Sequence, residues 1–255
     1  MEIKGFITHK MAESYSDCQD YFGVNVKNKK IAISDGMSQS IFPFEWARIL
    51  VEFYLATDKI KLTEDLQPLK VEWSKYVDNE LKRQKKAGMS TWMLENFLTE
   101  RKGAAATFCG VKFSGYEWYG QVLGDSCLIE INENNQIINI YTSQTGDFGN
   151  HPDYFDSINN GRGIPKSING ILKKGWKLLF VTDPFAELLY IKRKDNIEID
   201  FIAELLQISS QEDFECLVDK WRRYENMHND DSTIIIVEHD GNEEFKINEN
   251  TRTIE

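Results

Sequence analysis

The sequence has few residues that form disulfides or soft-metal sites. Four cysteines and four histidines occur among 255 residues, and neither set shows the CxxC or zinc-ligand spacing of a metal or redox motif. No apolar run approaches the roughly 20 residues that a transmembrane helix requires. The first ten residues also lack the basic and apolar regions of a signal peptide. We therefore expect free thiols in a reducing, cytoplasmic compartment, with no membrane as a partner.

Positive charge is also scarce. The chain has 30 Lys and Arg residues against 41 Asp and Glu residues, which gives a net charge of −11. Nucleic acids and anionic membranes are bound through basic surfaces. Neither is therefore expected as the main partner of this protein.

Linker-like stretches rich in Pro, Ser or Gly are missing, and the sequence has no internal repeat. We predict a single domain over residues 1–255, with its core in 1–240 and a loose tail in 241–255, and we expect a monomer. The hydrophobic content of 41% supplies enough core for a chain of this length, which buries about 70–75% of its unfolded surface when it folds.

Hydrophobic periodicity predicts strands and helices in separate runs. Period-two alternation indicates a hairpin of residues 21–26 and 31–34, and helical spacing then begins at Pro43. A second helical stretch follows at 62–86. The middle of the chain predicts an antiparallel meander, with strands at 104–113, 117–123, 127–132 and 136–141. Beyond it we predict a long surface loop at 143–170 and a strand at 176–182. Helices follow within 185–224, and a last strand at 232–238. This order is typical of an α+β fold with antiparallel sheets.

Several aspartates border these apolar runs: Asp20, Asp35, Asp125, Asp183 and Asp231. Asp20 precedes the first strand of the hairpin and Asp35 follows the second, so both lie at the same end. Carboxylates that converge repel one another unless cations compensate. Oxygen ligands without His or Cys suit Mg²⁺ or Mn²⁺, and two such ions can activate a water for attack on a phosphoryl group. Taken alone, the spacing is more typical of ordinary turn residues.

The order of the motifs changes this interpretation. The chain contains Gln19-Asp20, Asp35-Gly36-Met37, Gly-Ala-Ala-Ala-Thr at 103–107, Gly-Asp-Ser at 124–126, then Asp183 and Asp231. This series resembles the type 2C metal-dependent protein phosphatases, the PPM family, over nearly the whole chain. Residues 38–47 resemble its compact bacterial branch in particular. The resemblance implies a four-layer αββα sandwich, in which two antiparallel sheets are flanked by helices.

The resemblance also implies a set of catalytic and metal-binding residues. Asp35 is expected to bridge two Mg²⁺ or Mn²⁺ ions, and the carbonyl of Gly36 to bind one of them. Asp183 and Asp231 are expected to hold the other ion. The implied activity is hydrolysis of phosphoserine or phosphothreonine in a phosphoprotein, as part of signalling. The implied partner is either a Ser/Thr kinase or the target of one. The implied nucleophile is a metal-activated water, with no covalent intermediate.

Two further aspartates complete the metal set that the resemblance implies. Asp20 supports the site through water, and Asp125 serves a third, weaker ion. The second carboxylate of that third site corresponds to Glu187, which is one methylene longer than the aspartate usual in the family.

The substrate-binding residues depart from the family pattern. The position that often holds a phosphate-binding Arg is Tyr15, the acid before the first aspartate is Gln19, and Cys127 follows Gly-Asp-Ser in place of Arg. Lys10 and Arg162 are candidate replacements for the missing cation, although both positions are also typical of ordinary surface residues.

These departures leave two alternatives open. The first is a weakly active or inactive phosphatase-like domain that binds a partner or acts as a sensor in signalling. The second is a metal-dependent nuclease or nucleotide hydrolase, because the carboxylate chemistry is shared. The acidic surface argues against a nucleic-acid substrate.

Overall fold

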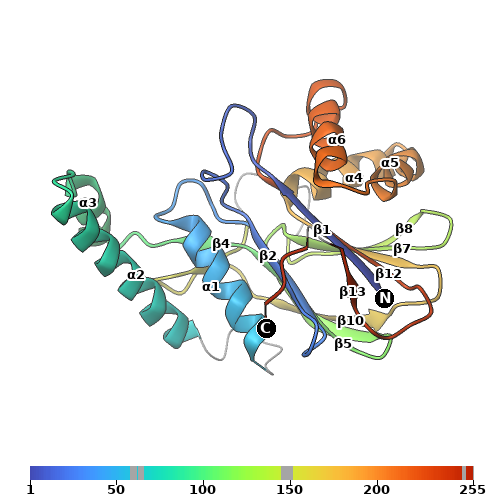
Figure 1. Ribbon diagram of the computed structural model, residues 1–255, viewed down its shortest axis with the longest axis horizontal. Coiled ribbons are helices and arrows are strands. Elements are labelled where there is room, and N and C mark those ends of the chain that lie inside the picture. Colours follow the sequence, from blue (N-terminus) through green and yellow to red (C-terminus); the bar gives the residue numbers. More distant parts are fainter. Residues whose placement is uncertain (58–61, 63–65, 145–151, 249–250, 255) are drawn as a thin grey trace.

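Two sheets form the centre of the molecule (Figure 1). The computed structural model describes residues 1–57, 62, 66–144, 152–248 and 251–254. The six-stranded sheet contains, in spatial order, β13 (Lys246–Ile247), β1 (Glu2–Thr8), β12 (Ser232–Glu238), β11 (Lys177–Val181), β7 (Cys127–Ile131) and β8 (Ile137–Tyr141). The five-stranded sheet contains β10 (Lys166–Ile171), β6 (Glu117–Leu123), β5 (Phe108–Ser114), β3 (Lys30–Ser34) and β2 (Tyr21–Asn25). Neighbouring strands are antiparallel, apart from β13 beside β1.

Helices cover the outer face of each sheet (Figure 1). On the side of the five-stranded sheet lie α1 (Pro43–Ala56), α2 (Leu66–Lys86) and α3 (Trp92–Thr99). On the side of the six-stranded sheet lie α4 (Asp183–Lys194), α5 (Glu198–Leu206) and α6 (Gln211–Tyr224). The α+β class and the four-layer sandwich predicted from the sequence are therefore confirmed.

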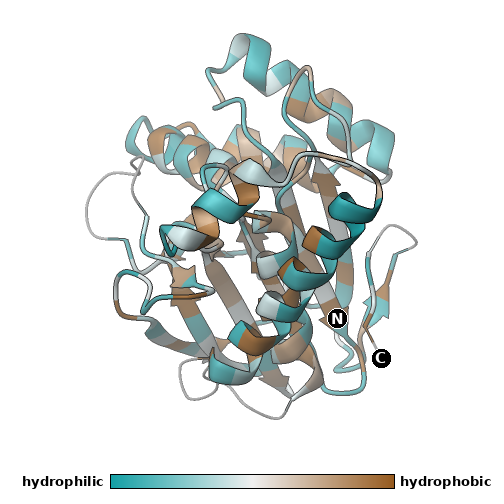
Figure 2. Cartoon of the chain, turned by 90° about the vertical axis from the view of Figure 1, so that its left-hand side faces the viewer, coloured by the Kyte–Doolittle hydropathy of each residue, from teal (hydrophilic) through white to brown (hydrophobic). Residues whose placement is uncertain are grey.

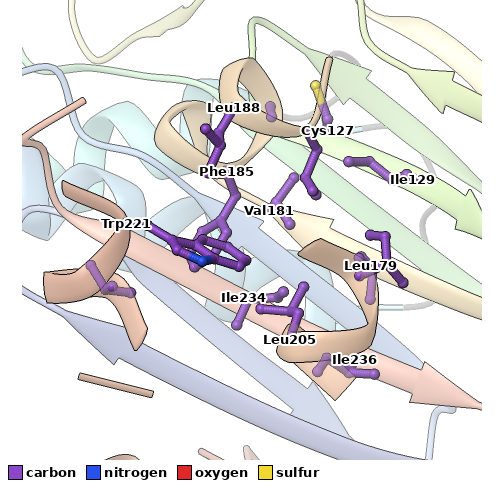
Figure 3. Packing of buried hydrophobic residues seen from close by; sticks show 14 of the residues in the cluster. Cys127, Ile129, Leu179, Val181, Phe185, Leu188, Leu205, Trp221, Ile234 and Ile236 are labelled. Atoms are coloured by element: carbon purple, nitrogen blue, oxygen red, sulfur yellow. The ribbon is translucent and has the colours of Figure 1, made fainter. Parts of the chain in front are cut away.

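Three buried clusters fill the three interfaces between these layers. Strand β12 shows how one strand serves two of them. Ile235 and Val237 belong to the cluster between the two sheets, whereas Ile234 and Ile236 belong to the cluster beneath α4, α5 and α6. Successive side chains of a strand point to opposite faces, so a strand with helices on one face and a sheet on the other is apolar throughout. Figure 3 shows the helix-side cluster, where Ile234 and Ile236 lie close to the side chains of the covering helices.

On the other side, helices α2 and α3 bury much less of their length than α1 does. Helix α2 has a single buried stripe, Leu69, Trp73 and Val77, at the four-residue spacing of one helix face. Figure 2 views this layer from outside and shows hydrophilic segments on the helices in front of hydrophobic strands. Within the polar stretch at 62–86, residues 66–86 thus form a helix that buries one narrow stripe.

Two segments differ from their predicted structure. Within 143–170, predicted as a long loop, the described residues include β9 (Phe155–Asp156) and β10. Strand β9 pairs with β4 (Ala105–Ala106), and β10 pairs with β6 at the edge of the five-stranded sheet. The pattern of β10 is polar because most of its side chains face solvent at this edge.

The tail at 241–255, predicted to be loose, is paired at both described ends. Strand β13 lies parallel to β1. Farther on, the N–H of Ile254 donates to the carbonyl of Val24 at 3.0 Å, and the N–H of Val24 donates to the carbonyl of Arg252 at 3.0 Å. The tail therefore runs along β1 of one sheet and β2 of the other.

Candidate metal centre

Acidic residues gather where the ends of several strands meet. Asp20 directly precedes β2, and Asp35 directly follows β3, its antiparallel neighbour. Asp125 lies just before β7, and Asp183 begins α4 just after β11, the strand that pairs with β7. Asp231 directly precedes β12, which pairs with β11 on its other side. Strand register thus brings the five predicted aspartates to the same end of the sandwich.

Two of these aspartates are buried and only partly hydrogen-bonded. Asp20 is fully buried, and its Oδ2 accepts a hydrogen bond from the Thr233 hydroxyl at 2.6 Å. Its Oδ1, and Oδ1 of the buried Asp125, have no hydrogen-bond partner among the described residues. Burial, together with the charge of nearby Asp231, raises the pKa of Asp20 to about 8. Burial, with the charge of Asp230 adding to it, raises the pKa of Asp125 to about 7.

The pKa values of Asp35 and Asp183 are raised by the same two causes, burial and the negative charge of neighbouring acids. Burial raises the pKa of Asp35 well above its ordinary value, and the charges of Asp20 and Asp183 act in the same direction. Burial also raises the pKa of Asp183 well above its ordinary value, and the charge of Asp125 adds to it. Buried carboxylates that raise one another's pKa are costly to ionise unless cations compensate them. The oxygen-rich donor set and its orphaned oxygens therefore fit hard divalent cations.

Asp183 also belongs to a compact group of possible metal ligands with His228 and Asp230. One ligand atom from each of the three lies within 4.8 Å of the other two. Neither His228 nor Asp230 is among the residues predicted from the sequence as ligands. Their position, two residues apart and just before an apolar strand, marks both as candidates, but it does not distinguish Asp230 from Asp231.

Asp231, the predicted ligand at this position, is engaged in a different way. Its Oδ2 accepts a hydrogen bond from the N–H of Gln19 at 2.8 Å, and its Oδ1 accepts one from the N–H of Lys10 at 3.1 Å. Its carboxylate thus joins β12 to the segments around residues 10 and 19. Of the two adjacent aspartates, Asp230 thus lies beside Asp183, whereas Asp231 is hydrogen-bonded to main-chain amides.

The loop at Gly36 is held by the short strand β4. The N–H of Met37 donates to the carbonyl of Ala105, and the N–H of Thr107 donates to the carbonyl of Asp35, each at 2.9 Å. These bonds flank Gly36, so its own carbonyl is not used by them. A Cβ atom at Gly36 would lie 2.7 Å from the carbonyl oxygen of Gln19 and 2.8 Å from that of Pro43. A glycine is required here because the backbone of three segments comes too close for a side chain.

Tyr15, at the position of the expected arginine, faces α6. Its hydroxyl donates to Oε1 of Glu215 and accepts a hydrogen bond from Nε2 of Gln211 at 2.9 Å. The side chain is half exposed. Position 15 therefore supplies no cation to the carboxylate cluster.

The two candidate replacements lie in different places. The ammonium of Lys10 lies 3.0 Å from Oδ1 of Asp230 and donates a hydrogen bond to the hydroxyl of Ser38 at 2.7 Å. Burial lowers the pKa of Lys10, but the hydrogen bond and charge of Asp230 outweigh it and raise that pKa, so the ammonium is charged at neutral pH. Arg162 is exposed and lies 3.9 Å from Asp153. Of the two cations, Lys10 contacts the group that contains Asp183.

Comparison with known proteins supports the fold. No protein-family model matches the sequence, and no curated protein matches it in sequence. Among solved structures, the chain is similar to the serine/threonine phosphatase Stp1 from Staphylococcus aureus, with a TM-score of 0.61 at 16% identity over 94% of this chain and 95% of that one. It is also similar to the S. agalactiae serine/threonine phosphatase, with a TM-score of 0.56 at 14% identity over 92% and 99%. The photosystem II phosphatase PBCP gives a TM-score of 0.58 at 15% identity over 92% and 96%. The fold that the resemblance to type 2C phosphatases implies is thus confirmed.

Proposed function

We propose that this chain, which has the fold of these serine/threonine phosphatases, is itself a metal-dependent phosphatase that hydrolyses phosphoserine or phosphothreonine in proteins. One observation carries the proposal. The carboxyl groups of Asp20, Asp35, Asp125 and Asp183 lie at one end of the sandwich, with pKa values raised by burial and by the charges of neighbouring acidic residues. Carboxyl groups with strongly raised pKa values cluster at catalytic sites, and bound cations offset the cost of ionising them.

The proposed metal ligands are Asp35, Asp183 and Asp230, together with the carbonyl of Gly36. What favours Asp230 over Asp231 is its distance from Asp183 and the main-chain bonds that occupy both oxygens of Asp231. Bound Mg²⁺ or Mn²⁺ supplies positive charge for the phosphoryl oxygens and lowers the pKa of water. His228, the third member of the group with Asp183 and Asp230, is a further candidate ligand. Imidazole suits transition metals rather than Mg²⁺, so Mn²⁺ is the first ion to test.

The remaining acids have supporting roles in this proposal. Asp20 is hydrogen-bonded to Thr233 through one oxygen, and its second oxygen is buried without a partner among the described residues, so it can accept from a metal-bound water. Asp231 fixes the main chain at Lys10 and Gln19, on either side of the cluster. Asp125, whose pKa is also raised by the charge of Glu187, is the candidate for a third, weaker ion.

The activity is tested directly with a phosphothreonine peptide and p-nitrophenyl phosphate. We expect phosphate release that depends on Mn²⁺ and stops when EDTA is added, because carboxylates alone supply no positive charge to the phosphoryl oxygens and do not activate water. ATP and single-stranded DNA serve as comparison substrates and should be hydrolysed far more slowly. Absence of hydrolysis in pure protein with excess Mn²⁺ would contradict the proposal.

A pair of adjacent variants tests which aspartate binds the metal. Asp230→Asn should weaken Mn²⁺ binding by more than about 100-fold, above the 10–100-fold typical of residues that only support a ligand. Asp231→Asn keeps one acceptor oxygen for the main-chain amides and should change Mn²⁺ affinity by less than about 10-fold. Isothermal titration with MnCl₂ measures both values, and the reverse order would return the ligand role to Asp231.

Tyr15 favours a second candidate function, a phosphatase-like binding domain. A site that lacks the usual arginine at this position loses a bidentate contact to phosphate. In that case the phosphothreonine peptide should bind in calorimetry and remain intact after prolonged incubation with Mn²⁺. Rapid turnover of the peptide would exclude this alternative.

A further inference from the structure

The main chain at Lys10 is anchored to the loop that precedes β12. The N–H of Lys10 donates to the carboxylate of Asp231 at 3.1 Å. The guanidinium of Arg222 on α6 donates to the carbonyl of His9 at 3.0 Å and to the carbonyl of Asp230 at 2.6 Å. Because both segments share these bonds, the base of the Lys10 side chain is fixed relative to Asp183 and Asp230.

The ammonium of Lys10 spans two loops that border the carboxylate cluster. It lies 3.0 Å from Oδ1 of Asp230 and donates to Ser38 at 2.7 Å. Ser38 follows Asp35 by three residues, so its loop approaches the cluster from the five-stranded sheet. The Lys10 side chain is 15% exposed, so most of it is packed against the protein and its ammonium is engaged by Asp230 and Ser38. An ordinary surface lysine extends its ammonium into solvent.

We propose that Lys10 binds the phosphate of the substrate in this protein, and that it neutralises Asp230 while no metal is bound. This inference rests on the proposed phosphatase function. A divalent cation that takes over the charge of Asp230 weakens the hold of that carboxylate on the ammonium. A phosphate oxygen is then the strongest acceptor available to the ammonium. The flexible side chain of Lys10 allows the ammonium to move from Asp230 to the phosphate.

Two opposite effects follow from this double role. Replacement of Lys10 removes a positive charge that competes with the metal for Asp230, so metal binding becomes tighter. The same replacement removes a charged contact to phosphate, so substrate binding becomes weaker. A merely structural role for Lys10 predicts losses in both, because misplacing the loop harms the two kinds of binding together.

The experiment compares Lys10→Met and Lys10→Arg with the wild type in the full chain. Lys4→Met is the matched control, since Lys4 lies on β1 and is ion-paired with Glu2 at 3.4 Å. For Lys10→Met we expect about 3- to 10-fold tighter binding of MnCl₂ by calorimetry, as expected for loss of one like charge nearby. We expect KM for a phosphothreonine peptide, and the inhibition constant of inorganic phosphate, to rise about 10- to 100-fold, with a smaller change in kcat. Lys10→Arg should restore most of the phosphate binding, and Lys4→Met should match the wild type.

Either binding result can overturn the inference. An unchanged KM in Lys10→Met shows that the phosphate is held elsewhere, and weaker Mn²⁺ binding shows that Lys10 does not compete for Asp230. A wild type that binds Mn²⁺ but hydrolyses nothing contradicts the proposed function instead. In that outcome the MnCl₂ titration and the phosphate titration of the same variants still decide the role of Lys10.

Discussion

Asp183→Asn should abolish Mn²⁺-dependent hydrolysis and, at the same time, make the metal-free protein more stable. The loss of activity, at least about 100-fold, follows from removal of a proposed metal ligand. The gain in stability follows from the raised pKa of Asp183, which burial and the charge of Asp125 make costly to ionise. An amide of the same shape removes that charge from the cluster. A gain of about 1 kcal/mol corresponds to a rise in Tm of about 2–4 °C for a domain of this size.

Activity assays with MnCl₂ and thermal unfolding in EDTA measure the two effects. Asp219→Asn is the control, because Asp219 forms an exposed pair with Arg223 at 3.8 Å, and such pairs contribute little to stability. A metal-free Asp183→Asn that unfolds at or below the wild-type Tm would show that repulsion in the cluster is compensated without metal. Retained Mn²⁺-dependent activity would remove Asp183 from the proposed ligands.

The metal-free protein should become less stable as the pH rises from about 4 to about 8. The pKa values of Asp20 and Asp125 are raised to about 8 and about 7 in the folded state, against about 3.9 in an unfolded chain. The folded state therefore binds more protons than the unfolded state within this window. Its stability is greatest below the unfolded pKa and is lost as the pH rises through the folded pKa values. Bound Mn²⁺ should remove most of this dependence, because the cations then balance the ionised carboxylates.

Thermal unfolding at intervals between pH 5 and 8, with EDTA or with MnCl₂, tests this expectation. We expect Tm in EDTA to fall by several degrees across the range and the difference between the two series to widen with pH. Asp183→Asn should show a shallower fall in EDTA, because one member of the cluster no longer ionises. A Tm in EDTA that stays level or rises with pH would contradict the raised pKa values.

Local signals in the sequence were sufficient to predict that Asp20, Asp35, Asp125 and Asp183 lie at one end of the sandwich. The hairpin between Asp20 and Asp35 and the strand before Asp183 have clear apolar patterns, and a carboxylate next to a strand end is placed by that strand. The choice between Asp230 and Asp231 was beyond such reasoning. Neighbouring residues at the start of a strand point in different directions, and here the main-chain amides of distant residues engage one of them.

Long-range pairing explains the other differences from the predicted structure. Strand β10 contains Lys, Ser, Asn and Gly, which have low strand propensity, and it exists because β6 offers it an unpaired edge. The position of Lys10 beside Asp230 depends on Arg222 and Asp231, which lie more than 200 residues away in the sequence. Neither contact leaves a periodic pattern in the sequence.

The C-terminal segment has a consequence for how this protein behaves in a crowded solution. An uncovered strand at the edge of a sheet offers its free amides and carbonyls to strands of other chains, which is a common start of aggregation. In this protein the same short segment lies along β1 of one sheet and along Val24 of β2 in the other. A stretch with little hydrophobic content of its own thus shields one margin of each sheet from intermolecular pairing.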